Sequence, residues 1–147
     1  MCLIQVKEIV KQDGTGYRLV HLTSTERARD FINIPLDVYE KKSRTHQYMA
    51  LYGSEYYKIN RWYKSKDHSD KKTGSRMTYL KYKAGFHIFK TKKAALKFNR
   101  EMDLKAIVRK VEYKNAYLSG KTAIFGWSDI YPEHTCIVAE QMRIVEE

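Results

Sequence analysis

The stretch YKAGFHIFKTKKAALKF, residues 82–98, decides the fold, because an apolar strand pattern runs directly into a helical one. GFHIF has the apolar and aromatic side chains of a strand. Thr91 then stands where its hydroxyl can cap the first turn, which predicts a helix over residues 92–102. The apolar side chains that recur on one face of this helix are Ala95, Phe98 and Met102. Their spacing predicts a helix that packs on a sheet and exposes its lysines to water.

Strand-like runs lie on both sides of this unit. They are rich in β-branched and aromatic residues and are separated by polar stretches, which indicates extended segments. The expected segments are INIPLDVYEK (32–41), HQYMALY (46–52), EYYKINRWYK (55–64), MTYLKY (77–82), AIVRKVEYKNAYL (106–118) and CIVAEQMRIV (136–145). Gly53 and Ser54 are expected to form the turn between the second and third segments.

The N-terminal region has the pattern of a hairpin followed by a short helix. LIQVKEIV and YRLVHL are two β-rich runs, and DGTG at 13–16 supplies turn residues between them. The sequence TSTE at 23–26 has the spacing of a capping box, which predicts a helix through about Phe31. Pro35 prevents that helix from continuing.

These segments together predict an α+β fold. We expect a mostly antiparallel sheet with one helix, about 92–102, packed on it, and a short N-terminal helix. The length of 147 residues suits a single domain over residues 1–147. The run SKDHSDKKTGS at 65–75 has no large apolar residue, so we expect a flexible, solvated loop there.

The composition excludes several classes of protein. No run approaches the roughly 18 apolar residues of a membrane span, and the N-terminus lacks a signal-peptide pattern, so we expect a cytoplasmic protein without a membrane partner. Cys2 and Cys136 are far apart and form no ligand motif, so we expect no disulfide, metal or cofactor. Cys2 as an N-terminal nucleophile is the alternative to a buried apolar role, which is the commoner one for a free cysteine. The sequence does not settle the oligomeric state.

Positive charge and aromatic residues coincide in the middle of the chain. The net charge is +11, and residues 41–121 hold 22 Lys or Arg against 6 Asp or Glu. Nucleic acid requires cations for its phosphates and flat faces for its bases. The sequence therefore predicts a nucleic-acid-binding surface. Its expected members are Tyr56, Tyr57, Lys58, Arg61, Trp62, Tyr63, Lys64, Arg76, Lys81, Lys83, Lys92, Lys93, Lys97 and Arg100. The alternative is a solvated basic surface whose tyrosines are half-buried in the sheet.

His87 is the weak candidate for a catalytic residue. If Phe86 and Ile88 face the core, alternation along the strand sends His87 and Phe89 to the opposite face. There a histidine could bind phosphate or act as an acid or base, or it could hold the end of the strand by a hydrogen bond, which is the commoner role. His21, His46, His68 and His134 show no metal-ligand spacing.

The order of these motifs resembles a known class of small domains. GFHIF, the helical Ala95, IVRKVEY, Gly120 and IVAEQMRIV, preceded by IPLDVYEK, resemble uncharacterised domains common in phage proteins and beside pentapeptide repeats. The resemblance covers about residues 34–145, and it implies a fold and a phage or mobile-element origin but no chemistry.

Charge and resemblance together predict a non-enzymatic phage accessory protein, in the host cytoplasm, that binds nucleic acid or a nucleoprotein. One form of this function is the inhibition of a host defence nuclease, in the manner of an anti-CRISPR protein. The alternative is a small enzyme that binds a nucleotide or transfers ADP-ribose. His87, Tyr57 and Glu55 or Glu112 are its conceivable participants, although no spacing supports it.

Overall fold

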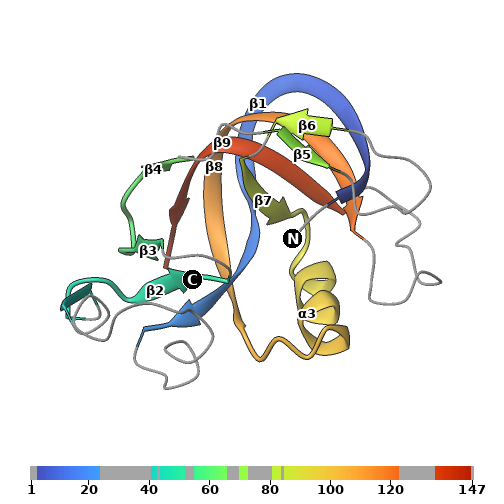
Figure 1. Cartoon of the computed structure of the whole chain (residues 1–147). Helices are drawn as coiled ribbons and strands as arrows, with labels where there is room; N and C mark the ends of the chain where they lie inside the picture. The colour runs from blue at the N-terminus through green and yellow to red at the C-terminus, as the bar shows by residue number, and fades with distance from the viewer. Residues whose placement is uncertain are drawn as a thin grey trace.

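A computed structural model describes the chain at residues 3–23, 41–42, 44–51, 55–65, 70–72, 81–83, 85–122 and 135–146. In this part of the chain the structure is a mostly antiparallel sheet with one helix (Figure 1). The expected N-terminal helix, segment 32–41 and the turn at Gly53 and Ser54 lie outside the described residues, except for Thr23 and Lys41. The general α+β architecture expected from the sequence is therefore confirmed.

The strand and helix of the opening stretch form as expected. Strand β7 (Phe86–Phe89) leads into helix α3 (Lys92–Glu101), and the Thr91 hydroxyl accepts a hydrogen bond of 3.2 Å from the amide of Ala94. The apolar face of the helix is buried at Ala94, Ala95 and Phe98, while its lysines are exposed. The helix thus docks on the sheet through the predicted face.

The predicted N-terminal hairpin is wrong. Residues Leu3–Leu22 form one continuous strand, β1, of 20 residues, which pairs antiparallel with the 16-residue strand β8 (Ile107–Thr122). The expected turn residues produce register shifts in this pair, between Glu8 and Gln12 and between Gln12 and Gly14. The pair bends there instead of reversing, because β-bulges and glycines let paired strands turn a corner.

Four strands form a closed circuit of hydrogen bonding. Strand β1 pairs with β7 and β8, and strand β9 (Cys136–Ile144) pairs with the same two strands. This part of the sheet therefore curls into a small barrel, as the curved ribbons show (Figure 1). At Gly16 a Cβ atom would lie 2.5 Å from Ile88 Cγ2 and 2.7 Å from the Phe89 carbonyl oxygen, so the approach of β7 to β1 requires glycine.

Short strands extend the sheet on both sides of the barrel. Strand β2 (Tyr48–Ala50) pairs with β1 and with β3 (Tyr56–Tyr57), whereas β4 (Tyr63–Lys64) pairs with β9. The expectation of one extended segment over 55–64 is therefore wrong. The chain turns at Asn60, whose φ of 61° is one that asparagine tolerates, and the Asn60 amide donates to the Ile144 carbonyl oxygen at 2.7 Å.

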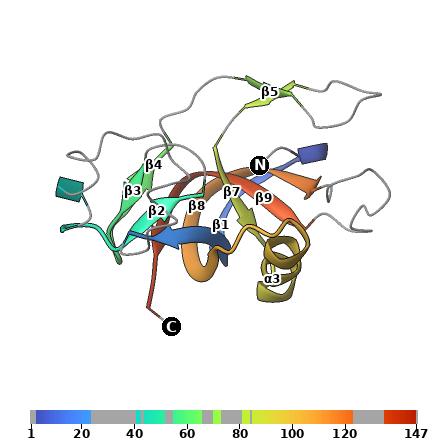
Figure 2. The same ribbon diagram turned by 60° about the horizontal axis from the view of Figure 1, so that its bottom comes forward.

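A separate two-stranded sheet carries part of the expected loop. Strands β5 (Asp70–Lys72) and β6 (Lys81–Lys83) pair antiparallel with each other. Of the segment 65–75, the structure describes Ser65 and these three residues of β5. Figure 2 shows this hairpin apart from the main sheet.

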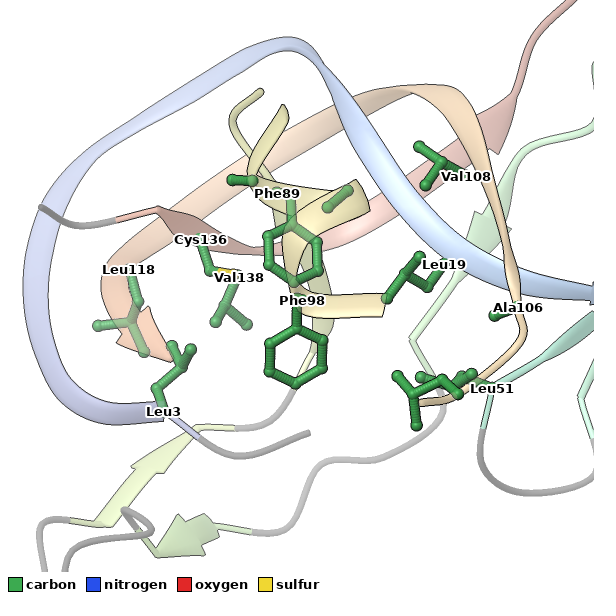
Figure 3. Close-up of a cluster of buried hydrophobic side chains, with 13 residues drawn as sticks. Leu3, Leu19, Leu51, Phe89, Phe98, Ala106, Val108, Leu118, Cys136 and Val138 are labelled. Atoms are coloured by element: carbon green, nitrogen blue, oxygen red, sulfur yellow. The ribbon is translucent and has the colours of Figure 1, made fainter. Parts of the chain in front are cut away.

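Two apolar cores lie on the two faces of the sheet. The inner core includes Phe86, Ile88, Val111, Ile137 and Met142. The outer core lies beneath α3, where the rings of Phe89 and Phe98 are 5.4 Å apart (Figure 3). Strand β7 contributes to both cores by alternation, because successive side chains point to opposite faces. The outward-facing position beside the helix is thus occupied by Phe89, and it is not open to a ligand.

Candidate nucleic-acid interface

Trp62 lies against two cationic side chains on the outer face of the sheet. The Nζ atom of Lys114 is 4.2 Å from the centre of the indole ring, and the guanidinium carbon of Arg143 is 5.1 Å from it. Both distances are within the range of cation–π attraction. Trp62 remains partly exposed, and Lys114 is exposed. An aromatic face and two cations therefore share one place on the surface.

The strand register explains why these side chains meet. In β4, Tyr63 pairs with the buried Met142, so its neighbour Lys64 points to the outer face together with Gln141. Gln141 also pairs with Lys114 of β8. The three strands β4, β9 and β8 thus carry a row of polar side chains on their outer face. We call Trp62, Lys64, Lys114 and Arg143 the Trp62 surface.

Glu112 positions the guanidinium of Arg143. The Nε and Nη2 atoms of Arg143 donate to Glu112 Oε2 at 3.2 and 2.9 Å. The two residues are directly opposite each other on β8 and β9. This pair holds the guanidinium in place beside Trp62, but it also puts one carboxylate among the cations.

Tyr63 faces the inner core, on the side of β4 opposite to the Trp62 surface, and Arg61 lies over its ring. The guanidinium carbon of Arg61 is 5.6 Å from the centre of the Tyr63 ring, and Arg61 is exposed. The Tyr63 hydroxyl accepts a hydrogen bond of 2.7 Å from the amide of Lys58, which ties the turn together. Of the predicted surface, Trp62 and Lys64 thus share the outer face, whereas Arg61 and Tyr63 contact each other on the inner side.

Two of the predicted tyrosines are inside the protein. Tyr57 is 1% exposed and Tyr56 is 9% exposed. The Tyr57 ring meets Tyr63 and Phe86 edge-on, with ring centres 5.1 and 6.4 Å apart. Burial raises the pKa of Tyr57 well above its usual value. Both rings already contact protein, so neither can stack on a base in this conformation.

The predicted cations of the helix lie elsewhere. Lys92, Lys93, Lys97 and Arg100 are exposed on α3, which packs over the outer core. Figures 1 and 2 both show α3 on the opposite side of the molecule from β3 and β4. Lys97 faces Glu101 at 3.9 Å. The sequence predicted one continuous basic surface, whereas the described residues carry at least two separate groups of cations.

The other predicted residues are scattered or lie outside the description. Lys83 contacts Glu140 at 3.6 Å and lies 5.5 Å from the centre of the Tyr117 ring. The backbone of Lys81 is in β6, but its side chain is outside the described residues, as is all of Arg76. Lys114 and Arg143 were missed, although Arg143 alternates with the apolar Met142 and Ile144, which predicts that it faces outwards.

His87 is arranged as a structural residue. Its side chain is partly buried beside the outer core, and Nδ1 is 3.1 Å from the Gly85 carbonyl oxygen. The expected alternation is confirmed, because Phe86 and Ile88 belong to the inner core and Phe89 to the outer. Tyr57 and Glu55 do meet, with the phenol donating to the carboxylate at 2.7 Å. Tyr57 is too deeply buried there to reach a substrate.

Two further observations bear on the possible classes of site. Among the described residues, no three His, Cys, Asp or Glu side chains are grouped as metal ligands would be. Within the same part of the chain, no helix is both long and apolar enough to cross a membrane. Comparisons with protein-family models, with curated proteins and with solved structures give no match for this chain.

Proposed function

We propose that this protein is a non-enzymatic accessory protein, of phage or mobile-element type, that binds single-stranded nucleic acid through the Trp62 surface. The observation that supports this proposal is the position of the indole ring beside Lys114 and Arg143. Single strands are favoured over duplexes, because a partly exposed ring can stack on a base whose faces are free.

The charges around Trp62 suit a polyanion. Lys114 and Arg143 are near the ring, Lys64 lies on the same face of the sheet, and Glu112 is the carboxylate that pairs with Arg143. Cations neutralise phosphates and release their counterions, which supplies most of the affinity of sequence-independent binding. The chain's net charge of +11 adds a long-range attraction to any nucleic acid.

The test is a titration of a labelled single-stranded oligonucleotide at low salt, followed by fluorescence anisotropy. Trp62→Leu should weaken binding, since stacking on an aromatic ring contributes roughly 1–3 kcal/mol per base. Lys114→Gln should weaken it more than Lys97→Gln, which removes the same charge from the exposed face of α3. Equal losses in these two lysine variants would show that charge is dispersed, and the proposal would fail.

A narrower form of the proposal is that the protein inhibits a host defence nuclease by occupying its nucleic-acid path. The sequence resemblance supports this form, and no residue pattern adds to it. A pull-down from the host with the wild-type protein, and with Trp62→Leu as the control, tests it. Recovery of one nuclease complex by the wild type alone is expected, whereas recovery of no specific partner would contradict it.

A further inference from the structure

Two arginines lie side by side on the inner face of the sheet, away from the Trp62 surface. Arg18 of β1 and Arg109 of β8 are direct partners in the antiparallel register, so their side chains leave the sheet on the same face. Each guanidinium packs on aromatic rings. Arg18 lies 5.1 Å from the centre of the Phe86 ring and 5.9 Å from that of Tyr57, and Arg109 lies 5.6 Å from that of Tyr48.

The tyrosines that support the two arginines are themselves neighbours. Tyr48 and Tyr57 are direct partners in the pairing of β2 with β3, and both belong to the inner core. The two pairs thus form a four-membered group in which two cations face two aromatic rings. Both arginines are partly buried, and neither is fully enclosed.

This arrangement leaves positive charge uncompensated. Like charges at directly opposed positions of a sheet repel each other. Among the described residues, no carboxylate is within 4.0 Å of either guanidinium, and Glu55 accepts from the hydroxyl of Tyr57 at 2.7 Å. The Nε atom of Arg18 is buried without a hydrogen-bond acceptor. A buried donor without a partner lowers the stability of the folded state, and the repulsion between the two cations lowers it further.

The guanidinium groups also keep donors free. Arg18 has one acceptor in the described chain, the His87 carbonyl oxygen, at a long 3.5 Å from Nη1. Arg109 donates from Nε to the Tyr48 hydroxyl at 3.2 Å and from Nη1 to the Val108 carbonyl oxygen at 3.1 Å. An arginine has five N–H donors, so the Nη2 group of each side chain can still donate to a ligand.

We propose that Arg18 and Arg109 form a binding site for a phosphate dianion, either free phosphate or a terminal phosphate monoester. A phosphate monoester carries about two negative charges at neutral pH and has three acceptor oxygens. The two guanidinium groups match this charge, and their Nη2 groups can donate to the phosphate oxygens, whereas a single carboxylate would compensate only one of the two cations. The aromatic rings hold the guanidinium planes in position before the ligand arrives, which lowers the entropic cost of binding.

The test measures the thermal unfolding of the full chain against inorganic phosphate, with chloride used to keep the ionic strength constant. A ligand that binds only the folded state raises the unfolding temperature as its concentration increases. The wild type should show this rise. Arg18→Met and Arg109→Met should each weaken the apparent phosphate affinity roughly tenfold or more. Arg100→Met removes one charge from the exposed face of α3, outside both proposed sites, and should leave the phosphate response unchanged.

Two further measurements complete the test. If Arg109→Met does not fold, Arg109→Lys replaces it, because lysine keeps the charge and loses the fork; the same loss of phosphate response is expected. A 5′-phosphorylated dinucleotide compared with its 5′-hydroxyl form distinguishes a strand end from free phosphate. A wild-type response no greater than that to chloride, or equal responses in Arg18→Met and Arg100→Met, would overturn the proposal.

Discussion

The backbone amide of Asn115 donates a hydrogen bond of 3.0 Å to Asp13 Oδ1, across the β1–β8 pair and over 102 positions of sequence. Asn115 has a φ of 55°, and its side-chain amide donates to Glu140 Oε2 at 3.3 Å. Both strands leave regular pairing close to these residues. The bond therefore fixes the corner at which the two long strands bend into the barrel.

Substitution of Asn115 tests this corner. Asn115→Ala should lower the free energy of unfolding by about 1–2 kcal/mol, because alanine is strained at positive φ and loses the bond to Glu140. Asn115→Gly should cost less, because glycine accepts this φ and keeps the amide that donates to Asp13. Urea unfolding followed by circular dichroism measures both. A glycine variant less stable than the alanine variant would contradict the assignment.

The fold was predictable from the sequence where local signals decide it. Thr91, the helical spacing of Ala95 and Phe98, and the alternation around His87 each depend on near neighbours. The N-terminal corner was not predictable, because Asp13 and Gly14 have the same local preferences in a hairpin turn and in a bulge. A partner more than a hundred residues away decides between the two.

The cap of α3 provides a second test of stability. Thr91→Ala removes the acceptor of the Ala94 amide and should lower the free energy of unfolding by about 1 kcal/mol. Thr91→Ser keeps a hydroxyl at the same place and should cost much less. Thermal unfolding of the three proteins is the measurement, and equal losses in both variants would show that the hydroxyl does not cap the helix.

The buried thiol of Cys136 should make the protein less stable as the pH rises in the alkaline range. Burial raises the pKa of this thiol from 9.0 to about 12. The folded state therefore retains a proton that the unfolded state releases. The stability contributed by the protonated thiol is complete below pH 9 and is lost as the pH rises towards 12.

The comparison of wild type with Cys136→Ala isolates this contribution. The wild type should lose unfolding free energy more steeply between pH 9 and 11 than the variant, whereas the two should run parallel between pH 6 and 8. Denaturant unfolding at each pH provides the values. Parallel curves over the whole range would mean that the pKa of Cys136 does not differ between the folded and unfolded states.

Removal of the Glu112 carboxylate should strengthen the binding of oligonucleotides. Glu112→Gln removes the carboxylate beside Arg143, so oligonucleotide affinity should rise roughly two- to fivefold, as expected for one unit charge near a surface. Glu101→Gln on α3 makes the same change of charge away from Trp62 and should have a smaller effect. The same anisotropy titration measures both, and an equal rise would argue against a localised site.

The candidate site was only partly predictable. Tyr57 and Trp62 have similar aromatic and basic neighbours in the sequence, yet one ring is in the core and the other lies on the surface. The turn at Asn60 separates them, and it breaks the alternation that a single strand would impose. Lys114 and Arg143 come from distant strands, so their position beside Trp62 depends on the pairing of β8 with β9 and of β9 with β4.

The salt dependence of single-stranded oligonucleotide binding tests the central claim most directly. If the Trp62 surface neutralises phosphates, log K should fall linearly with log salt, with a slope of about 0.7 for each phosphate contacted. Lys114→Gln should reduce the magnitude of this slope by about 0.7, the contribution of one phosphate contact, whereas Lys97→Gln should leave the slope unchanged. Affinity no better than millimolar at low salt, or a slope that Lys114→Gln leaves unchanged, would contradict the account.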